Sequence, residues 1–343
     1  MCLTVSAGGE LMIPPRENLP RPCGSGVTTC VVSVSFGQRS GSGRATVAWL
    51  AMPEPVPCLL TVHAHPDDEA SKGAGTVARY HAKGVRTVLV TCTGGEAGEI
   101  LNPAMDRPEV VADLPAIRRR ELARSAEIIG YDEVVLLGYR DSGMPDSESN
   151  AHPDAFANAD FDEAVGRLVA VIRRERPQVI VTYPDDQSRY PHPDHLRVHD
   201  ISVPAFDRAG DPDAYPEAGG PWQPLKLYYS VWARKRIEAM HRRFRELGLE
   251  SPFSDEWFEG PSQDDRITTS VDLNGYGDVR MDALLAHETQ VDPESPFWFG
   301  LPRDEQTAIH PYDDYILART LVDSGRPESD LFAGVPARVG RPS

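Results

Sequence analysis

Apolar, β-branched runs alternate with amphipathic segments from residue 58 onward. The runs are apolar over their whole length, which is typical of strands buried on both faces. Between them, apolar positions recur with helical spacing. We expect strands at 58–64, 86–92, 133–138 and 178–183, and helices at 71–83, 115–129 and 161–176.

This strand–helix–strand order predicts right-handed βαβ units. Such units build an α/β fold, a mostly parallel sheet with helices on both faces. Gly84, Gly130 and Pro177 lie where the helices should end. The carboxyl ends of the strands should then meet at one edge of the sheet, where open α/β sheets bind their ligands.

The regions outside this alternation are less regular. Residues 1–57, rich in Gly, Pro and Ser, read as a largely disordered N-terminal extension with one β-like run at 27–36. We expect one main domain at 58–324, followed by a surface or loose tail at 325–343. The second half of that domain offers strand candidates at 225–232 and 267–273 and helix candidates at 235–247, 279–290 and 312–322.

The charge balance narrows the class of protein. The net charge of -17 argues against a general nucleic-acid or anionic-membrane binder, because polyanions require basic patches. No apolar run reaches the roughly 18 residues of a membrane-spanning helix, and the N-terminus lacks the pattern of a secretory signal. Five cysteines without C-x-x-C spacing favour reduced thiols. We therefore expect a cytoplasmic protein, whose oligomeric state the sequence does not indicate.

Polar clusters follow each of the four predicted parallel strands. One site at the carboxyl ends of the strands would bring all four clusters together. The clusters are 65–69, 93–96, 139–142, and 185–186 with 190–195.

The first cluster suggests a metal. Three consecutive carboxylates, Asp67 to Glu69, repel one another unless a cation compensates them. His65 and Asp68 are three residues apart and can face one point, while His195 is the natural third ligand of a catalytic zinc that keeps one position for water. The alternative is a hydrogen-bonded His65 beside acids that merely favour a helix N-terminus.

The fourth cluster repeats the three-residue spacing in His192 and His195. Pro193 suits a first helical turn, so a helix should start here. His192 would face the cavity without binding metal, and Asp194 would orient a histidine ligand. The alternative is two surface histidines on a polar loop.

These residues resemble the LmbE-like, PIG-L family of metal-dependent N-deacetylases, over about 58–337. The motifs that carry the resemblance are Ala64-His65-Pro66-Asp67-Asp68-Glu69 and His192-Pro193-Asp194-His195. Further stretches are similar to one branch of that family, the mycothiol S-conjugate amidases. These stretches are 71–74, 93–96, 98–106, 141–143 and 286–290.

The resemblance implies a Rossmann-like fold and assigns roles to the site residues. It implies zinc held by His65, Asp68 and His195, although Fe²⁺ suits the same ligands. It implies Asp67 as general base, His192 as general acid or transition-state stabiliser, Tyr190 as oxyanion donor and Asp194 as the residue that orients a histidine.

Three further residues are expected to contact substrate. Asp141 is similar to a family carboxylate that binds a sugar hydroxyl, although an ordinary turn explains it equally well. Lys72 is similar to a lysine of the conjugate amidases where the related deacetylases differ, although a solvated lysine is the commoner case. Met144 is expected to line the pocket.

The expected function is zinc-dependent hydrolysis of the cysteinyl–glucosamine amide of mycothiol S-conjugates, in thiol detoxification or a related biosynthetic step. The substrate would be a small thiol–glycoside conjugate. One alternative is deacetylation of N-acetylglucosaminyl inositol. Others are a non-haem iron oxygenase using His65, Asp67 and His195, and a sugar-binding protein with a structural metal.

Overall fold

The computed structural model describes residues 56–336 and the backbone of two short strands nearer the N-terminus. The chain divides into two units, Met1–Pro53 and Glu54–Ser343. In the first unit, β1 (Thr4–Val5) pairs antiparallel with β2 (Leu11–Met12). Most of the predicted extension, including the β-like run at 27–36, lies outside the described residues.

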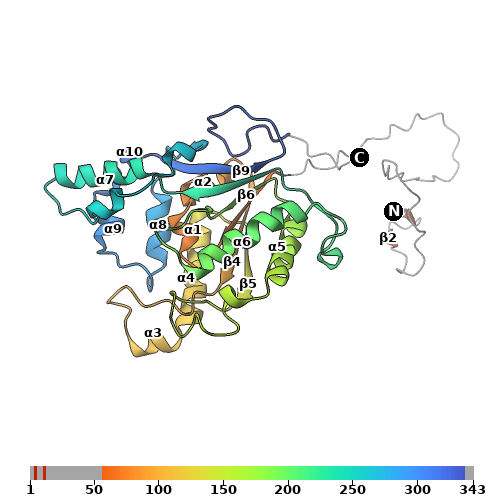
Figure 1. Cartoon of the computed structure of the whole chain (residues 1–343), viewed down its shortest axis with the longest axis horizontal. Helices are drawn as coiled ribbons and strands as arrows, with labels where there is room; N and C mark the ends of the chain where they lie inside the picture. Colours follow the sequence, from red (N-terminus) through yellow and green to blue (C-terminus); the bar gives the residue numbers. More distant parts are fainter. Residues whose placement is uncertain (1–3, 6–10, 13–55, 337–343) are drawn as a thin grey trace. The chain divides into compact units, whose positions relative to one another are not determined.

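A seven-stranded sheet forms the centre of the second unit (Figure 1), with the strand order β5-β4-β3-β6-β7-β9-β8. The first five strands in this order are parallel, and β9 runs antiparallel to both of its neighbours. The predicted α/β fold with a mostly parallel sheet is therefore confirmed. The strands are β3 (Cys58–His63), β4 (Arg86–Thr93), β5 (Glu133–Tyr139), β6 (Val179–Thr182), β7 (Lys226–Val231), β8 (Thr269–Asp272) and β9 (Tyr312–Thr320).

Helices connect these strands. The single helix expected at 71–83 is instead two helices, which meet at Lys72 and Gly73. Gly73 has φ 89°, and a Cβ there would lie 2.9 Å from the Tyr315 hydroxyl, so a larger residue would not fit. The helices are α1 (Asp68–Ser71), α2 (Ala74–Ala82), α3 (Pro108–Ala112), α4 (Leu114–Ile129), α5 (Phe161–Glu175), α6 (Pro193–Arg208), α7 (Arg234–Glu246), α8 (Val279–Ala286), α9 (Pro296–Phe299) and α10 (Arg303–Ile309).

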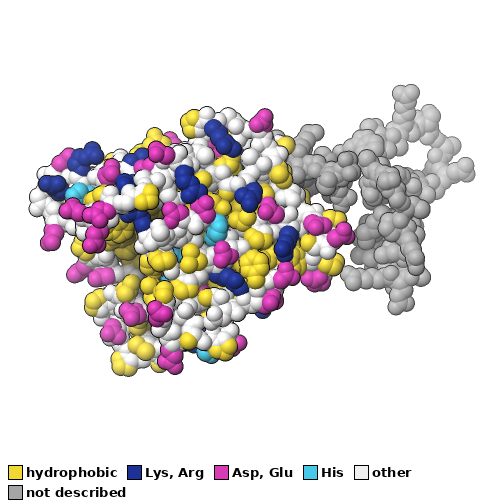
Figure 2. Space-filling model, viewed as in Figure 1, with side chains coloured by type: hydrophobic (Ala, Val, Ile, Leu, Met, Phe, Trp, Pro, Cys, Tyr) yellow, Lys and Arg dark blue, Asp and Glu magenta, His cyan; other side chains and the backbone are white. Residues whose placement is uncertain are grey.

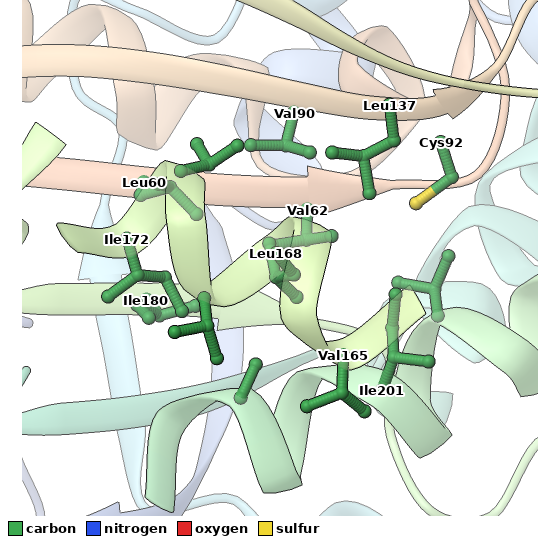
Figure 3. Packing of buried hydrophobic residues seen from close by; sticks show 14 of the residues in the cluster. Leu60, Val62, Val90, Cys92, Leu137, Val165, Leu168, Ile172, Ile180 and Ile201 are labelled. Atoms are coloured by element: carbon green, nitrogen blue, oxygen red, sulfur yellow. The ribbon is translucent and has the colours of Figure 1, made fainter. Parts of the chain in front are cut away.

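The two faces of the sheet bury different helices. Side chains along a strand alternate between faces, so Leu60 and Val62 of β3 pack in a cluster with residues of α5 and α6 (Figure 3). Leu59, which precedes Leu60 and points to the other face, packs in the cluster that contains residues of α1, α2 and α8. All six residues of β3 are buried, which explains its continuous apolar run.

The strand order reverses direction beside β3. From β3 the chain proceeds outward through β4 and β5 on one side, and through β6 and β7 on the other. In doubly wound sheets, ligands bind at the carboxyl ends of the strands where this order reverses. That point lies between β3 and β6, the two strands that precede the two histidine motifs.

The prediction of a helix at 312–322 is wrong, because residues Tyr312–Thr320 form β9. The segment has apolar residues at spacings compatible with either a helical turn or a strand. Pairing with β7 on one side and β8 on the other provides backbone partners that favour the strand. Tyr315 and Ile316 then pack in clusters on opposite faces.

Residues 325–336 pack on the sheet and are not a loose tail. Leu331 is fully buried, and Glu328 forms an isolated parallel bridge with Thr269 of β8. Phe332 and Val335 pack against the same hydrophobic cluster, which contains Leu331 and Leu59.

The surface carries both signs of charge. Figure 2 shows acidic and basic side chains interspersed over the face in view. Within the residues that the structure describes, no helix is long and apolar enough to cross a bilayer.

Candidate active site

The two histidine motifs meet at the carboxyl ends of β3 and β6. His65 lies two residues after β3, and α1 begins at Asp68. His192 caps the N-terminus of α6, which starts at Pro193 as expected and carries His195 in its first turn. These side chains are all at least nine-tenths buried. The alternative interpretation, in which the histidines lie on the surface, is therefore wrong.

Asp68 lies between two of the histidines. Its Oδ2 atom is 3.4 Å from Nδ1 of His65 and 3.4 Å from Nε2 of His195. At zinc–ligand distances of about 2.0–2.1 Å, the ligand atoms around a tetrahedral ion lie roughly 3.3 Å apart. The three predicted ligands therefore have the chemistry, and in these two pairs the spacing, of a metal site.

Other donor atoms surround the same point. Two sets of three side chains have ligand atoms all within 4.8 Å of one another: His65 with His192 and His195, and His65 with Asp141 and Asp194. His65 belongs to both sets and His195 to one of them, whereas Asp68 belongs to neither. Imidazole nitrogens and carboxylate oxygens suit zinc and ferrous iron alike.

Asp194 contacts His65 directly. Its Oδ2 atom lies 3.1 Å from Nε2 of His65 and accepts a hydrogen bond from the Ser142 amide at 3.0 Å. The Ser142 hydroxyl donates to the other oxygen. Because Nε2 of His65 faces Asp194, Nδ1 is the ring atom that remains for a metal.

Asp67 occupies a strained turn beside this group. Its φ of 112° is rare for any residue other than glycine, and its side chain remains about one-third exposed. The Arg118 guanidinium donates to Asp67 Oδ2 at 3.1 Å and to the Pro66 carbonyl at 2.6 Å. Enclosure raises the pKa of Asp67 to about 6, with Arg118 opposing the rise and Asp68 adding to it.

Burial and charge shift the histidines in opposite directions. Burial lowers the pKa of His195 to about 3, and burial together with the neighbouring His65 lowers the pKa of His192. His65 differs: burial alone would lower its pKa, but contacts with Asp141, Asp194 and Asp68 raise it well above 6.5. A cluster this rich in carboxylate favours a cation at its centre.

Tyr190 and Met144 lie at the exposed rim of the site. They are 55% and 52% exposed, and the Tyr190 hydroxyl lies 3.9 Å from the Met144 sulfur. The Tyr190 ring centroid is 6.0 Å from that of His192 and 5.4 Å from that of His195. Both residues can therefore contact a ligand that enters from solvent.

Lys72 and Asp141 contact the predicted metal ligands Asp68 and His65, respectively. Lys72 Nζ lies 2.5 Å from Asp68 Oδ1, so it contacts a predicted ligand and is not simply solvated. Asp141 is 3% exposed and accepts hydrogen bonds from the amides of Gly143 at 2.8 Å and Ala97 at 3.1 Å. A substrate hydroxyl would have to share an Asp141 oxygen with these amides.

One part of the fourth cluster lies elsewhere. Asp185 pairs with Arg266 at 2.8 Å, and its side chain is about half exposed. The Asp186 carbonyl accepts a hydrogen bond from Gln263 at 2.9 Å. These contacts connect the loop before Tyr190 to a distant segment and place neither residue among the buried donors.

Arg118 is a residue of the candidate site that the sequence interpretation missed. It is 2% exposed and also donates to the carbonyl of Gly95, where a Cβ would lie 2.4 Å from the guanidinium carbon. A signal existed in the helical pattern, since position 118 falls on the buried stripe of α4 with Leu122 and Ser125. Two adjacent arginines, Arg119 and Arg120, obscured which of the three points inward.

Comparisons with known proteins identify relatives of this chain. The family model described as PIG-L, GlcNAc-PI de-N-acetylase, matches residues 60–206. A mycothiol S-conjugate amidase of Streptomyces coelicolor is 44% identical over 286 residues, which cover 81% of this chain and 97% of that protein. The chain belongs to the PIG-L family. This PIG-L protein is an amide-hydrolysing enzyme.

A second relative carries a different name. A 1D-myo-inositol 2-acetamido-2-deoxy-alpha-D-glucopyranoside deacetylase of Streptomyces avermitilis is 40% identical over 289 residues, which cover 81% of this chain and 97% of that protein. Among solved structures, the N,N'-diacetylchitobiose deacetylase of Pyrococcus horikoshii has a TM-score of 0.53 and 18% identity, and covers 76% of this chain and 83% of its own. At that identity the likeness concerns the fold alone.

Proposed function

We propose that this PIG-L enzyme hydrolyses the cysteinyl–glucosamine amide of mycothiol S-conjugates. The products would be a mercapturic-type cysteine adduct and glucosaminyl inositol. The observation that carries the proposal is the 44% identity with a conjugate amidase over almost all of that protein. The contact of Lys72 with Asp68 supports it, since this lysine is the residue that resembles the conjugate amidases in particular.

In this proposal His65, Asp68 and His195 hold the metal, with zinc first and ferrous iron second. The donor atoms fit either ion. When bound, such an ion lowers the pKa of its water and polarises the amide carbonyl. The oxygenase alternative has no support in an amide-hydrolysing family with a parallel α/β sheet.

The chain's own residues then divide the work of hydrolysis. Asp67 takes the proton of the attacking water at a carboxylate oxygen, and its raised pKa suits this task near neutral pH. The Tyr190 hydroxyl donates to the oxyanion that develops on the former carbonyl.

Departure of the amine requires a proton, which we assign to His192. Nδ1 of His192 accepts a hydrogen bond from the Asp194 amide at 3.2 Å. Nε2 is therefore the ring atom that can carry a proton to the leaving nitrogen. Asp194 orients His65, while Asp141 and Met144 contact the glycoside and the rim of the substrate.

The second candidate is deacetylation of N-acetylglucosaminyl inositol. It is favoured by the relative that bears this activity in its name at 40% identity. Both reactions cleave an amide on the same glucosamine nitrogen, so the same residues would serve either one. The acyl group decides between them.

The test compares both amides on one metal-loaded preparation. We expect the bimane conjugate of mycothiol to be cleaved with the higher kcat/KM, and activity to disappear with a chelator and return with zinc or ferrous iron. Higher kcat/KM for the acetylated glycoside would replace the proposal with the deacetylase. Cleavage of neither amide would overturn both.

A contaminating hydrolase must be distinguished from the enzyme itself. Asp67→Asn is the informative variant, and Asp185→Asn is its matched control because that carboxylate lies outside the site. We expect loss of activity only in the first. Full hydrolysis by Asp67→Asn would indicate a contaminant or a binding protein with a structural metal.

A further inference from the structure

The backbone of Asp67 requires something to hold it. Its φ of 112° persists only where the surrounding structure over-determines it. Arg118 holds the side chain and the preceding carbonyl. The Asp67 amide has a different partner, Oε2 of Glu69, to which it donates at 2.9 Å.

Glu69 is itself held by two other elements. Its Oε1 atom accepts a hydrogen bond from the Ser125 hydroxyl on α4 at 2.5 Å. Nε2 of His287, the residue that ends α8, lies 2.6 Å from the same oxygen. All three side chains are fully buried, so water does not compete for these hydrogen bonds.

Three groups surround the two carboxylate oxygens of Glu69. His287 and Ser125 contact Oε1, and the Asp67 amide donates to Oε2. Because contacts from α4 and from the end of α8 fix one oxygen, the other oxygen stays in place as the acceptor for the Asp67 amide.

From these contacts we propose that Glu69 and His287 are positioning residues that hold Asp67 in its strained conformation and aim its carboxylate at the reacting water. This inference rests on the proposed role of Asp67 as general base. The three consecutive carboxylates then have three different roles. Asp67 is the general base, Asp68 is a metal ligand, and Glu69 positions Asp67 without contacting the substrate.

A purely structural role is the competing explanation, because Glu69 also joins α1 to α4 and α8. The chain offers a matched control for it. Glu121 on α4 accepts hydrogen bonds from the Thr289 amide at 2.8 Å and hydroxyl at 2.7 Å. It is buried and attaches α4 to the same segment two residues beyond His287, without touching Asp67.

The experiment compares His287→Leu, His287→Gln and Glu121→Gln. Misplacing a catalytic group slightly can cost about a hundredfold in rate. We expect His287→Leu to lower kcat by about tenfold to a hundredfold with KM and metal content unchanged. His287→Gln keeps an N–H donor and should recover most of this loss. Glu121→Gln should lower Tm without lowering kcat.

A second measurement does not depend on activity. We expect hydrogen exchange of the Asp67 amide to be faster in Glu69→Gln and His287→Leu than in the wild type, with exchange of β3 unchanged. Ser125→Ala removes one hydrogen bond to Glu69 without leaving a new charge, and should produce a smaller change of the same kind. It also serves if His287→Leu does not fold.

The results separate this inference from the proposed function. Wild-type protein inactive on both amides would overturn the function, while the exchange measurement would still decide whether Glu69 and His287 hold the turn. Unchanged exchange, unchanged kcat in His287→Leu, or an equal loss of kcat in Glu121→Gln would overturn the inference.

Discussion

Two buried clusters of charge in this chain differ in how they are balanced. Near the edge of the sheet, Lys226 and Glu328 have fully buried side chains with Nζ and Oε1 2.8 Å apart. The other Glu328 oxygen accepts hydrogen bonds from the hydroxyls of Tyr228 at 2.6 Å and Thr269 at 2.7 Å. Each charge in this cluster has an opposite charge and the hydrogen bonds that it needs.

The cluster at the ends of β3 and β6 has no such balance. Four carboxylates meet there, and among residues 56–336 Lys72 and Arg118 are the permanent cations in contact with them. The carboxylates are Asp67, Asp68, Asp141 and Asp194. Burial alone therefore does not mark a functional site, whereas an excess of one sign of charge does.

The variant Asp67→Asn tests most directly whether the cluster at the ends of β3 and β6 is functional. Removing a general base should lower kcat by about 10²- to 10⁴-fold. The fold should persist, because the change relieves repulsion between neighbouring carboxylates. Kinetics on the cleaved amide and a thermal melt check both outcomes. A large loss of stability with little loss of kcat would mean that this cluster is structural as well.

Lys226→Met tests the balanced cluster. Leaving Glu328 buried without its cation should lower the free energy of unfolding by about 3–5 kcal/mol. Denaturant titration measures the loss, and activity per folded molecule should remain that of the wild type. Reduced kcat in the folded fraction would connect this cluster to catalysis.

Lys72→Met changes the unbalanced cluster by one charge. Lys72 is a cation in contact with Asp68, so it opposes a metal ion at the same carboxylate. We expect several-fold tighter zinc binding in the variant, measured by competition with a chelator. The same variant should lose part of its preference for the S-conjugate amide. Weaker zinc binding would show that Lys72 orients Asp68 as a ligand.

The smallest expected effect is the loss at low pH of the stability that Glu328 contributes. Burial would raise the pKa of Glu328, but Lys226 and the neighbouring hydroxyls lower it below 4.5. A carboxyl group with a lowered folded pKa contributes stability above its unfolded pKa and loses it as the pH falls through the folded value. The advantage of wild type over Glu328→Gln should therefore shrink as pH is lowered through about 4.5. An advantage that grows in acid would contradict the sign of the shift.

The sequence predicted the five parallel strands and the edge strand β8, but it predicted a helix where β9 lies. Continuous apolar runs marked β3, β4 and β6, because strands covered on both faces leave that pattern. The segment that forms β9 lacked such a run, and its backbone partners lie far away in the chain. Tertiary pairing overrode a local pattern that also fitted a helix.

The residues of the candidate site also fall into those that local sequence features indicate and those that only the fold reveals. His65, Asp68 and His195 could be proposed as ligands because strand ends and three-residue spacings are local features. Arg118 was not, because only a folded helix shows which of three adjacent arginines points inward. The helix expected to reach 290 ends at Ala286, which puts His287 at its terminus facing Glu69.

The sequence by itself determined the βαβ order, the edge of the sheet that carries the chemistry and the residues with metal-binding character. These follow from hydrophobic period, chain order and the fixed hand of the crossovers. The tertiary structure decided which carboxylates are balanced and what holds Asp67. Glu69 and His287 are 218 positions apart, and Lys226 and Glu328 are 102. No local pattern encodes such pairs, because only packing of the whole sheet brings them within hydrogen-bonding distance.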